Sequence, residues 1–131
     1  DDAIARALHQ FGRALGIAFQ IQDDLLDLSG DERVVGKSIG KDLGKGKLTL
    51  PLIYHLHSAG QSERGRTLRL IEQKDGEALH ETLAASGAID EATQTANRLV
   101  NEALEHLETV PEGPGRSMLS AMAQAVIARS H

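Results

Sequence analysis

The chain has 131 residues, of which 40% are hydrophobic and 25% are charged, so it is long enough for one folded domain and unlike a disordered chain. Two Phe, one Tyr and no Trp leave a methyl-rich core, which favours packed helices over an aromatic-rich β-sandwich. The absence of Cys excludes disulfides and thiolate metal sites. A net charge of -5 argues against a nucleic-acid partner.

The sequence contains no recognisable targeting signal. No apolar run approaches the roughly 20 residues that span a bilayer, and no signal-peptide pattern is present. We therefore expect a soluble, cytoplasmic chain without a transmembrane segment. It begins without Met and already within a helical pattern, so we also expect it to be a piece of a longer polypeptide.

Residues 1–29 contain no Pro and predict one long helix. Large apolar residues fall on two sides of the helical wheel: Ile4, Leu8, Leu15 and Leu26 on one, and Ile17, Ile21 and Leu28 on the other. A helix that is apolar on two sides is typical of a buried central element. The residues that follow look amphipathic, so we expect something outside this chain to supply part of its cover.

Residues 30–47 are predicted to form a basic, Gly-rich loop, because helical periodicity stops there and four of the chain's five Lys fall between residues 37 and 47. Helical patterns return beyond it, with Thr49 as the expected N-cap and Pro51 in the first turn. The expected helices cover residues 49–59, 62–73, 76–85, 89–108 and 114–129. With no convincing strand, the prediction is an all-α fold of about six helices.

The most informative stretch lies near the end of the long helix, where helical spacing places Gln20, Asp23, Asp24 and Asp27 in one sector. Carboxylates at these spacings repel one another and also face the negative end of the helix dipole. Divalent cations would turn both penalties into attraction, and Mg²⁺ prefers such ligands together with substrate phosphates. The acidic stripe and the basic loop together predict a metal-bridged diphosphate site. The alternative is that these carboxylates form a solvated helix end.

The motif also resembles that of a known family. Phe19-Gln20-x-x-Asp23-Asp24-x-x-Asp27, followed by Gly36-Lys37, Asp42 and Gly46-Lys47-x-Thr49-x-Pro51, closely resembles the second aspartate-rich region of trans-isoprenyl diphosphate synthases, the polyprenyl synthetases. The resemblance implies a helical bundle around a deep cavity, in which two DDxxD motifs hold Mg²⁺, or Mn²⁺ in its place. It implies a prenyltransferase of isoprenoid biosynthesis: an allylic diphosphate ionises, isopentenyl diphosphate attacks the cation, and proton loss completes the condensation.

The resemblance also assigns roles to individual residues. It implies that Asp23 and Asp27 ligate the metal directly and that Asp24 acts through water or as a neighbour of the ligands. Lys37 and Lys47 would contact the allylic diphosphate. Gln20 and Phe19 are expected to line the cavity near the reacting carbons. Asp42 is expected to support the loop.

One half of the family's machinery has no counterpart in this sequence. Asp1-Asp2 is followed by Ala5 where a first DDxxD motif would need its third Asp. We therefore expect residues 1–131 to be the C-terminal helical portion of a synthase that is a homodimer at full length. The isolated portion is expected to be inactive or nearly so.

Two other functions remain open at this stage. The chain could be a noncatalytic helical interaction module whose apolar first helix serves association. It could also belong to a class I terpene cyclase or a head-to-head condensing enzyme, although the segment from Gly46 to Pro51 favours the elongating synthases.

Other polar residues have simpler interpretations. His55 and His57 diverge on a regular helix and are not expected to share a metal. Arg64, Arg66 and Arg69 are expected to form a solvated surface or a contact with a partner chain. Tyr54 is expected to pack in the core.

Overall fold

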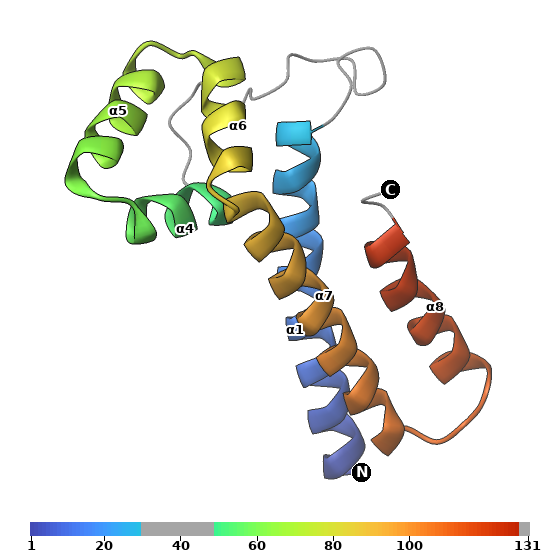
Figure 1. Cartoon of the computed structure of the whole chain (residues 1–131). Coiled ribbons are helices and arrows are strands. Elements are labelled where there is room, and N and C mark those ends of the chain that lie inside the picture. Colours follow the sequence, from blue (N-terminus) through green and yellow to red (C-terminus); the bar gives the residue numbers. More distant parts are fainter. Residues whose placement is uncertain (30–48, 129–131) are drawn as a thin grey trace. The chain divides into compact units, whose positions relative to one another are not determined.

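The computed structural model describes residues 1–29 and 49–128, without the side chains of residues 27–29. Its α-helices are α1 (Asp2–Ser29), α4 (Leu50–Ser58), α5 (Gln61–Glu72), α6 (Gly76–Ala85), α7 (Ala88–His106) and α8 (Pro114–Ala128), as labelled in Figure 1. A short 3₁₀ turn, Leu107–Thr109, follows α7. The described ranges contain these six α-helices and no strand, which confirms the all-α prediction.

The chain divides into two units, each with its own core. The first comprises Asp1–Gln22 and Gln94–His131, and the second comprises Asp23–Thr93. The first unit therefore takes most of α1, most of α7 and α8, whereas α4, α5 and α6 belong to the second.

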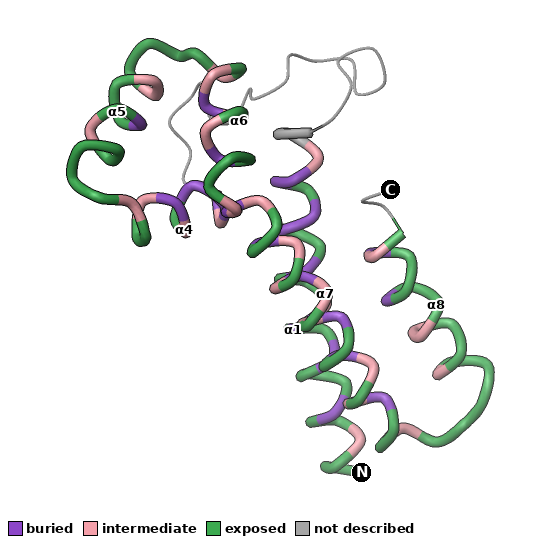
Figure 2. Tube along the Cα trace, in the orientation of Figure 1, coloured by how far each residue is buried: buried purple, intermediate pink, exposed green. Residues whose placement is uncertain are grey.

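Small side chains dominate the core of the first unit. Its buried residues are Phe11, Ala14 and Ala18 of α1, Val100 and Ala103 of α7, Leu107 of the 3₁₀ turn, and Ala123 and Val126 of α8. Alanines let helices approach closely, so the aliphatic, aromatic-poor composition is sufficient for this packing. The buried positions of α1 form the purple bands in Figure 2.

The described residues cover α1 on one side only. The covered stripe of Ala7, Phe11, Ala14 and Ala18 runs between the two sides on which the large apolar residues were expected to be buried. Leu8, Ile17 and Phe19 flank that stripe and remain 39%, 45% and 47% exposed. Cover on one side only agrees with the expectation that something outside this chain supplies part of the cover of α1.

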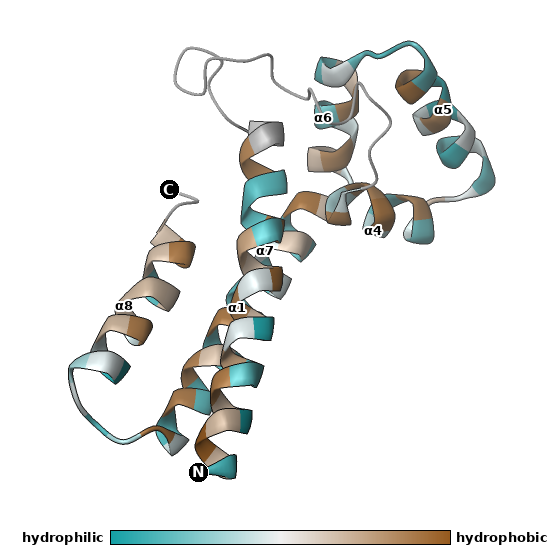
Figure 3. Cartoon of the chain, turned by 180° about the vertical axis from the view of Figure 1, so that it is seen from behind, coloured by the Kyte–Doolittle hydropathy of each residue, from teal (hydrophilic) through white to brown (hydrophobic). Residues whose placement is uncertain are grey.

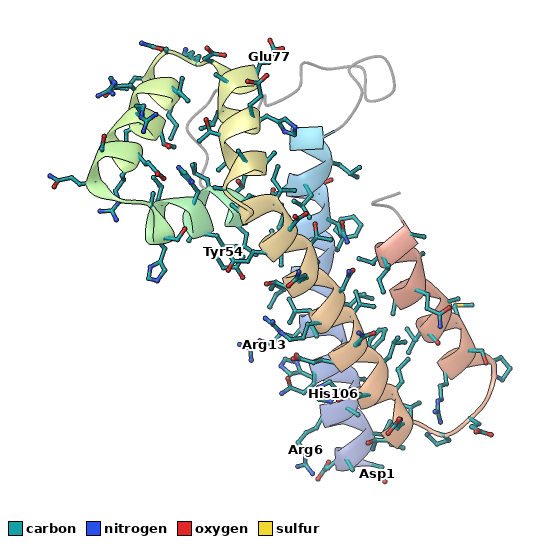
Figure 4. The ribbon with its side chains drawn as sticks, in the orientation of Figure 1. Asp1, Arg6, Arg13, Tyr54, Glu77 and His106 are labelled. Carbon is teal, nitrogen blue, oxygen red and sulfur yellow. The ribbon has the colours of Figure 1, made fainter. Side chains whose placement is uncertain are left out.

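The second unit has a separate leucine core. Leu52 of α4 packs with Leu79 and Leu83 of α6 and with Ala88, the first residue of α7. Tyr54 lies against this cluster and is half-buried, so its predicted packing role is confirmed (Figure 4). Figure 3 shows the contrast between the mostly hydrophobic α4 and the more hydrophilic α5.

Helix ends follow the local sequence with one exception. The Asp75 carboxylate accepts a hydrogen bond from the Ala78 amide at 3.1 Å and caps α6. Gly87 turns the chain into α7 with a φ of 83°, a left-handed conformation that glycine adopts without strain. Thr49 stands at the N-cap of α4 in extended conformation, but its hydroxyl makes no capping bond and is buried without a partner among the described residues.

Candidate functional site

The acidic stripe lies in the last turns of α1. Asp23 and Asp27 are one helical turn apart, and Gln20 precedes Asp23 by three residues, so the backbone places these three positions along one face. Asp23 is exposed, whereas Asp24 is only 7% exposed. Neighbouring helical positions are turned by about 100° from each other, which explains this difference. The two carboxylates therefore occupy different environments.

The chemistry of these residues fits Mg²⁺, because carboxylate oxygens are hard ligands of the kind that this ion prefers. Among the side chains that the structure describes, no group of three or more His, Cys, Asp or Glu could hold a metal ion. The expected triplet needs the Asp27 side chain, which lies outside the described residues. The triplet therefore stays a prediction.

The basic half of the expected site also lies outside the described residues. Lys37, Asp42 and Lys47 fall between residues 30 and 48, so their predicted roles stay predictions. Phe19 and Gln20 are described, and both are exposed on α1. Surface exposure is compatible with lining a cavity that another part of a longer protein closes.

Gln22 has an environment that the sequence analysis did not single out. Its side chain is fully buried, and neither its amide nitrogen nor its amide oxygen has a hydrogen-bond partner among the described residues. The signal was present in the sequence, because Gln22 follows Phe11 by eleven residues and Ala18 by four, which puts it on the buried stripe. A buried amide without partners is costly in free energy.

A second buried polar group lies in the other unit. His55 of α4 is 2% exposed and Thr67 of α5 is 1% exposed, and the His55 Nε2 atom lies 2.7 Å from the Thr67 Oγ1 atom in a buried hydrogen bond. His57 is exposed. This difference in burial agrees with the prediction that the two histidines diverge.

The three arginines of α5 do not share one role. Arg64 donates hydrogen bonds to the carbonyl oxygens of Leu56 and Ala59, at 3.1 and 3.0 Å, and so holds α5 against the end of α4. Arg66 and Arg69 instead line a cavity. All three arginines are exposed, as expected for a solvated surface, although Arg64 also bonds to the backbone and the other two line a hollow.

None of the described helices combines the length and the apolar character that crossing a membrane requires.

The fold and the acidic stripe define an all-α protein of the isoprenoid-synthase type, and comparison with known proteins identifies the family. Residues 1–89 match the polyprenyl synthetase family, and the chain belongs to it. It is similar to octaprenyl diphosphate synthase from Escherichia coli (strain K12), with 36% identity over 129 residues, which is 95% of this chain and 40% of the relative.

Solved structures show the same likeness. Geranylgeranyl pyrophosphate synthetase from Pyrococcus horikoshii superposes with a TM-score of 0.89 and 33% identity, over 97% of this chain and 40% of that one. Geranylgeranyl pyrophosphate synthase from Corynebacterium glutamicum, complexed with isoprenyl diphosphate and magnesium, gives a TM-score of 0.84 and 30% identity, over 98% of this chain and 38% of that one. The chain thus spans about 40% of the length of the relatives that it matches.

Proposed function

We propose that residues 1–131 form the C-terminal helical portion of a prenyl diphosphate synthase and bind the diphosphate of its allylic substrate. The observation that carries the proposal is the acidic stripe of α1 in a chain of the polyprenyl synthetase family. In the whole protein, an allylic diphosphate would ionise, isopentenyl diphosphate would attack the resulting cation, and proton loss would give a chain five carbons longer.

The roles proposed for the acidic residues come from the family resemblance, and the described positions support them. Asp23 is exposed and one turn from Asp27, so these two residues are the proposed direct ligands of Mg²⁺. Asp24 is nearly buried and is proposed to act through water or through its neighbours. When bound, Mg²⁺ would supply positive charge to stabilise the departing diphosphate.

The remaining proposed roles concern the substrate. Lys37 and Lys47 would hold diphosphate oxygens, and Asp42 would support the loop that carries them. Gln20 and Phe19 would line the cavity near the reacting carbons, which agrees with their exposure on α1. The first aspartate-rich motif is absent from this sequence, so the isolated chain is expected to bind a diphosphate without condensing it.

Isothermal titration of the chain with a non-hydrolysable allylic diphosphate analogue, with and without Mg²⁺, tests the proposal. We expect binding that requires Mg²⁺ and is lost in Asp23→Ala. Asp2→Ala removes an equal charge from the exposed first turn of the same helix and serves as the control. Equal loss in both variants, or no binding by the folded wild-type chain, would overturn the proposal.

A noncatalytic interaction module is the second candidate. The exposed apolar side chains of Leu8, Ile17 and Phe19 favour it, because large apolar groups of this kind mark association surfaces when they gather on one element. Under this alternative, a folded chain associates through α1 and shows no Mg²⁺-dependent binding of the analogue.

A further inference from the structure

A cavity of about 480 Å³ lies within the second unit, between α4, α5 and α6. Its volume is in the range of pockets that bind small organic molecules. The residues that line it are His55, Glu63, Arg66, Thr67, Arg69, Leu70, Gln73, Thr82, Ala85 and Ser86. Among the described residues that are proposed for the diphosphate site, none of Phe19, Gln20, Asp23 and Asp24 lines this cavity.

One face of α5 supplies most of the polar lining. Glu63, Arg66, Leu70 and Gln73 recur at spacings of three or four residues, so they project along one side of the helix. The hydrogen-bonded side chains of His55 and Thr67 are both nearly buried and form a polar floor. The cavity therefore combines a fixed floor with a wall of longer side chains.

The two guanidinium groups of the wall lack anionic partners among the described residues. The guanidinium group of neither Arg66 nor Arg69 makes a hydrogen bond or an ion pair with any residue that the structure describes. Glu63 supplies the single acidic side chain among the described lining residues. With His55 counted as neutral, the two arginines and Glu63 give the described lining a formal net charge of +1.

The hydroxyl groups of Thr82 in α6 and of Ser86 at its C-cap already donate to backbone carbonyl oxygens and are not available to donate to a ligand. Thr82 Oγ1 donates to the Ala78 carbonyl oxygen at 2.9 Å, and Ser86 Oγ donates to the Leu83 carbonyl oxygen at 2.9 Å. The guanidinium groups and the Gln73 amide are left to donate to a ligand. Guanidinium groups match the planar geometry of a carboxylate and bind it through two parallel hydrogen bonds.

We propose that this cavity binds a small organic carboxylate with an apolar body. One net positive charge suits a monoanion, the arginines suit its carboxylate, and Leu70 and Ala85 offer apolar contact to its body. This site is separate from the proposed function and requires neither Mg²⁺ nor a diphosphate.

Titration of the ¹⁵N-labelled chain with 2-naphthoate, followed by NMR, tests the proposal. We expect saturable shifts of amides in α5 and α6. Arg66→Gln and Arg69→Gln should each weaken binding by about tenfold, as expected when one charge-assisted contact is lost. Glu63→Gln should tighten binding, because it removes the negative charge from the wall. Arg98→Gln removes an exposed arginine outside the lining and should leave the affinity unchanged.

Two further measurements distinguish binding in the cavity from nonspecific attraction of an anion to the chain. Ala85→Leu fills the cavity without changing any charge and should weaken binding, with circular dichroism used to check that the variant folds. The uncharged isostere 2-naphthamide should bind more weakly than 2-naphthoate by at least about tenfold. Equal binding of the two compounds, equal losses in Arg66→Gln and Arg98→Gln, or tighter binding of inorganic phosphate than of 2-naphthoate would each overturn the proposal.

Discussion

The hydrogen bond between His55 Nε2 and Thr67 Oγ1, at 2.7 Å, joins α4 to α5 inside the second unit. Both residues are nearly buried, so water cannot replace either partner. The other ring nitrogen of His55, Nδ1, has no partner among the described residues. Among the described residues, the hydrogen bond to Thr67 is therefore the one polar contact that the imidazole of His55 makes.

Thr67→Val should destabilise the chain by about 2 kcal/mol, because it keeps the volume of the side chain and leaves the imidazole without its partner. Thr67→Ser keeps the hydroxyl and loses one buried methyl, so it should cost only about 1 kcal/mol. Urea unfolding followed by circular dichroism measures both values.

A double-mutant cycle gives the sharper check of this bond. Adding His55→Leu to Thr67→Val replaces both polar partners by apolar groups and should cost less than the sum of the two single substitutions. Strict additivity would show that the two side chains do not interact in solution.

Gln22→Met should stabilise the chain by about 1 kcal/mol, because it removes two buried polar atoms that lack partners and keeps an unbranched shape. The matched control is Gln10→Met, at an exposed position of the same helix, which should change the stability by less than about 0.5 kcal/mol. Thermal and urea unfolding measure both. Destabilisation by Gln22→Met would show that the amide is satisfied in solution.

The helices could be predicted from the sequence almost to the residue. The predicted range 76–85 coincides with α6, and the predicted 62–73 differs from α5 by one residue at each end. Pro51 lies in the first turn of α4, Gly87 precedes α7, and Pro111 follows the 3₁₀ turn after α7, so these residues mark the neighbouring helix ends locally. Such signals depend only on neighbours in the chain.

The packing could be predicted less well. Counting large apolar residues on α1 overlooked the alanines that form its covered stripe, because alanine contributes little to a hydrophobic pattern and much to close helix contact. The cavity of the second unit depends on how three helices meet, so no single helix pattern contains it. The metal triplet was predicted from one helix, but a test of it needs Asp27, whose side chain lies outside the described residues.

The exposed apolar side chains of α1 should make the isolated chain associate as its concentration rises. Leu8→Ser and Ile17→Ser remove two of them without touching the buried stripe, and each should shift the association to higher concentration. Sedimentation equilibrium measures the shift. Met118→Ser changes an exposed residue of α8 and is the control. An equal shift in the control would exclude α1 as the specific association surface.

Asp23→Asn should have opposite effects on stability with and without ligands. Without Mg²⁺ it relieves the repulsion between carboxylates one turn apart near the negative end of the α1 dipole, so stability should rise by about 0.3–0.5 kcal/mol. With Mg²⁺ and the diphosphate analogue, the wild-type chain should gain about 2.7 kcal/mol when the free analogue is at 100 times its dissociation constant. The variant should lose most of that gain.

Thermal unfolding of both proteins under both conditions distinguishes metal binding from an effect on the helix alone. Asp2 lies at the other end of α1, where the positive end of the helix dipole attracts its carboxylate. Asp2→Asn removes this attraction, so it should lower stability slightly and keep the full gain from the ligands. If Asp23→Asn keeps that gain, the α1 stripe does not bind the metal. If Asp2→Asn loses it as well, the ligands act through the net charge of the chain, and the proposed site is wrong.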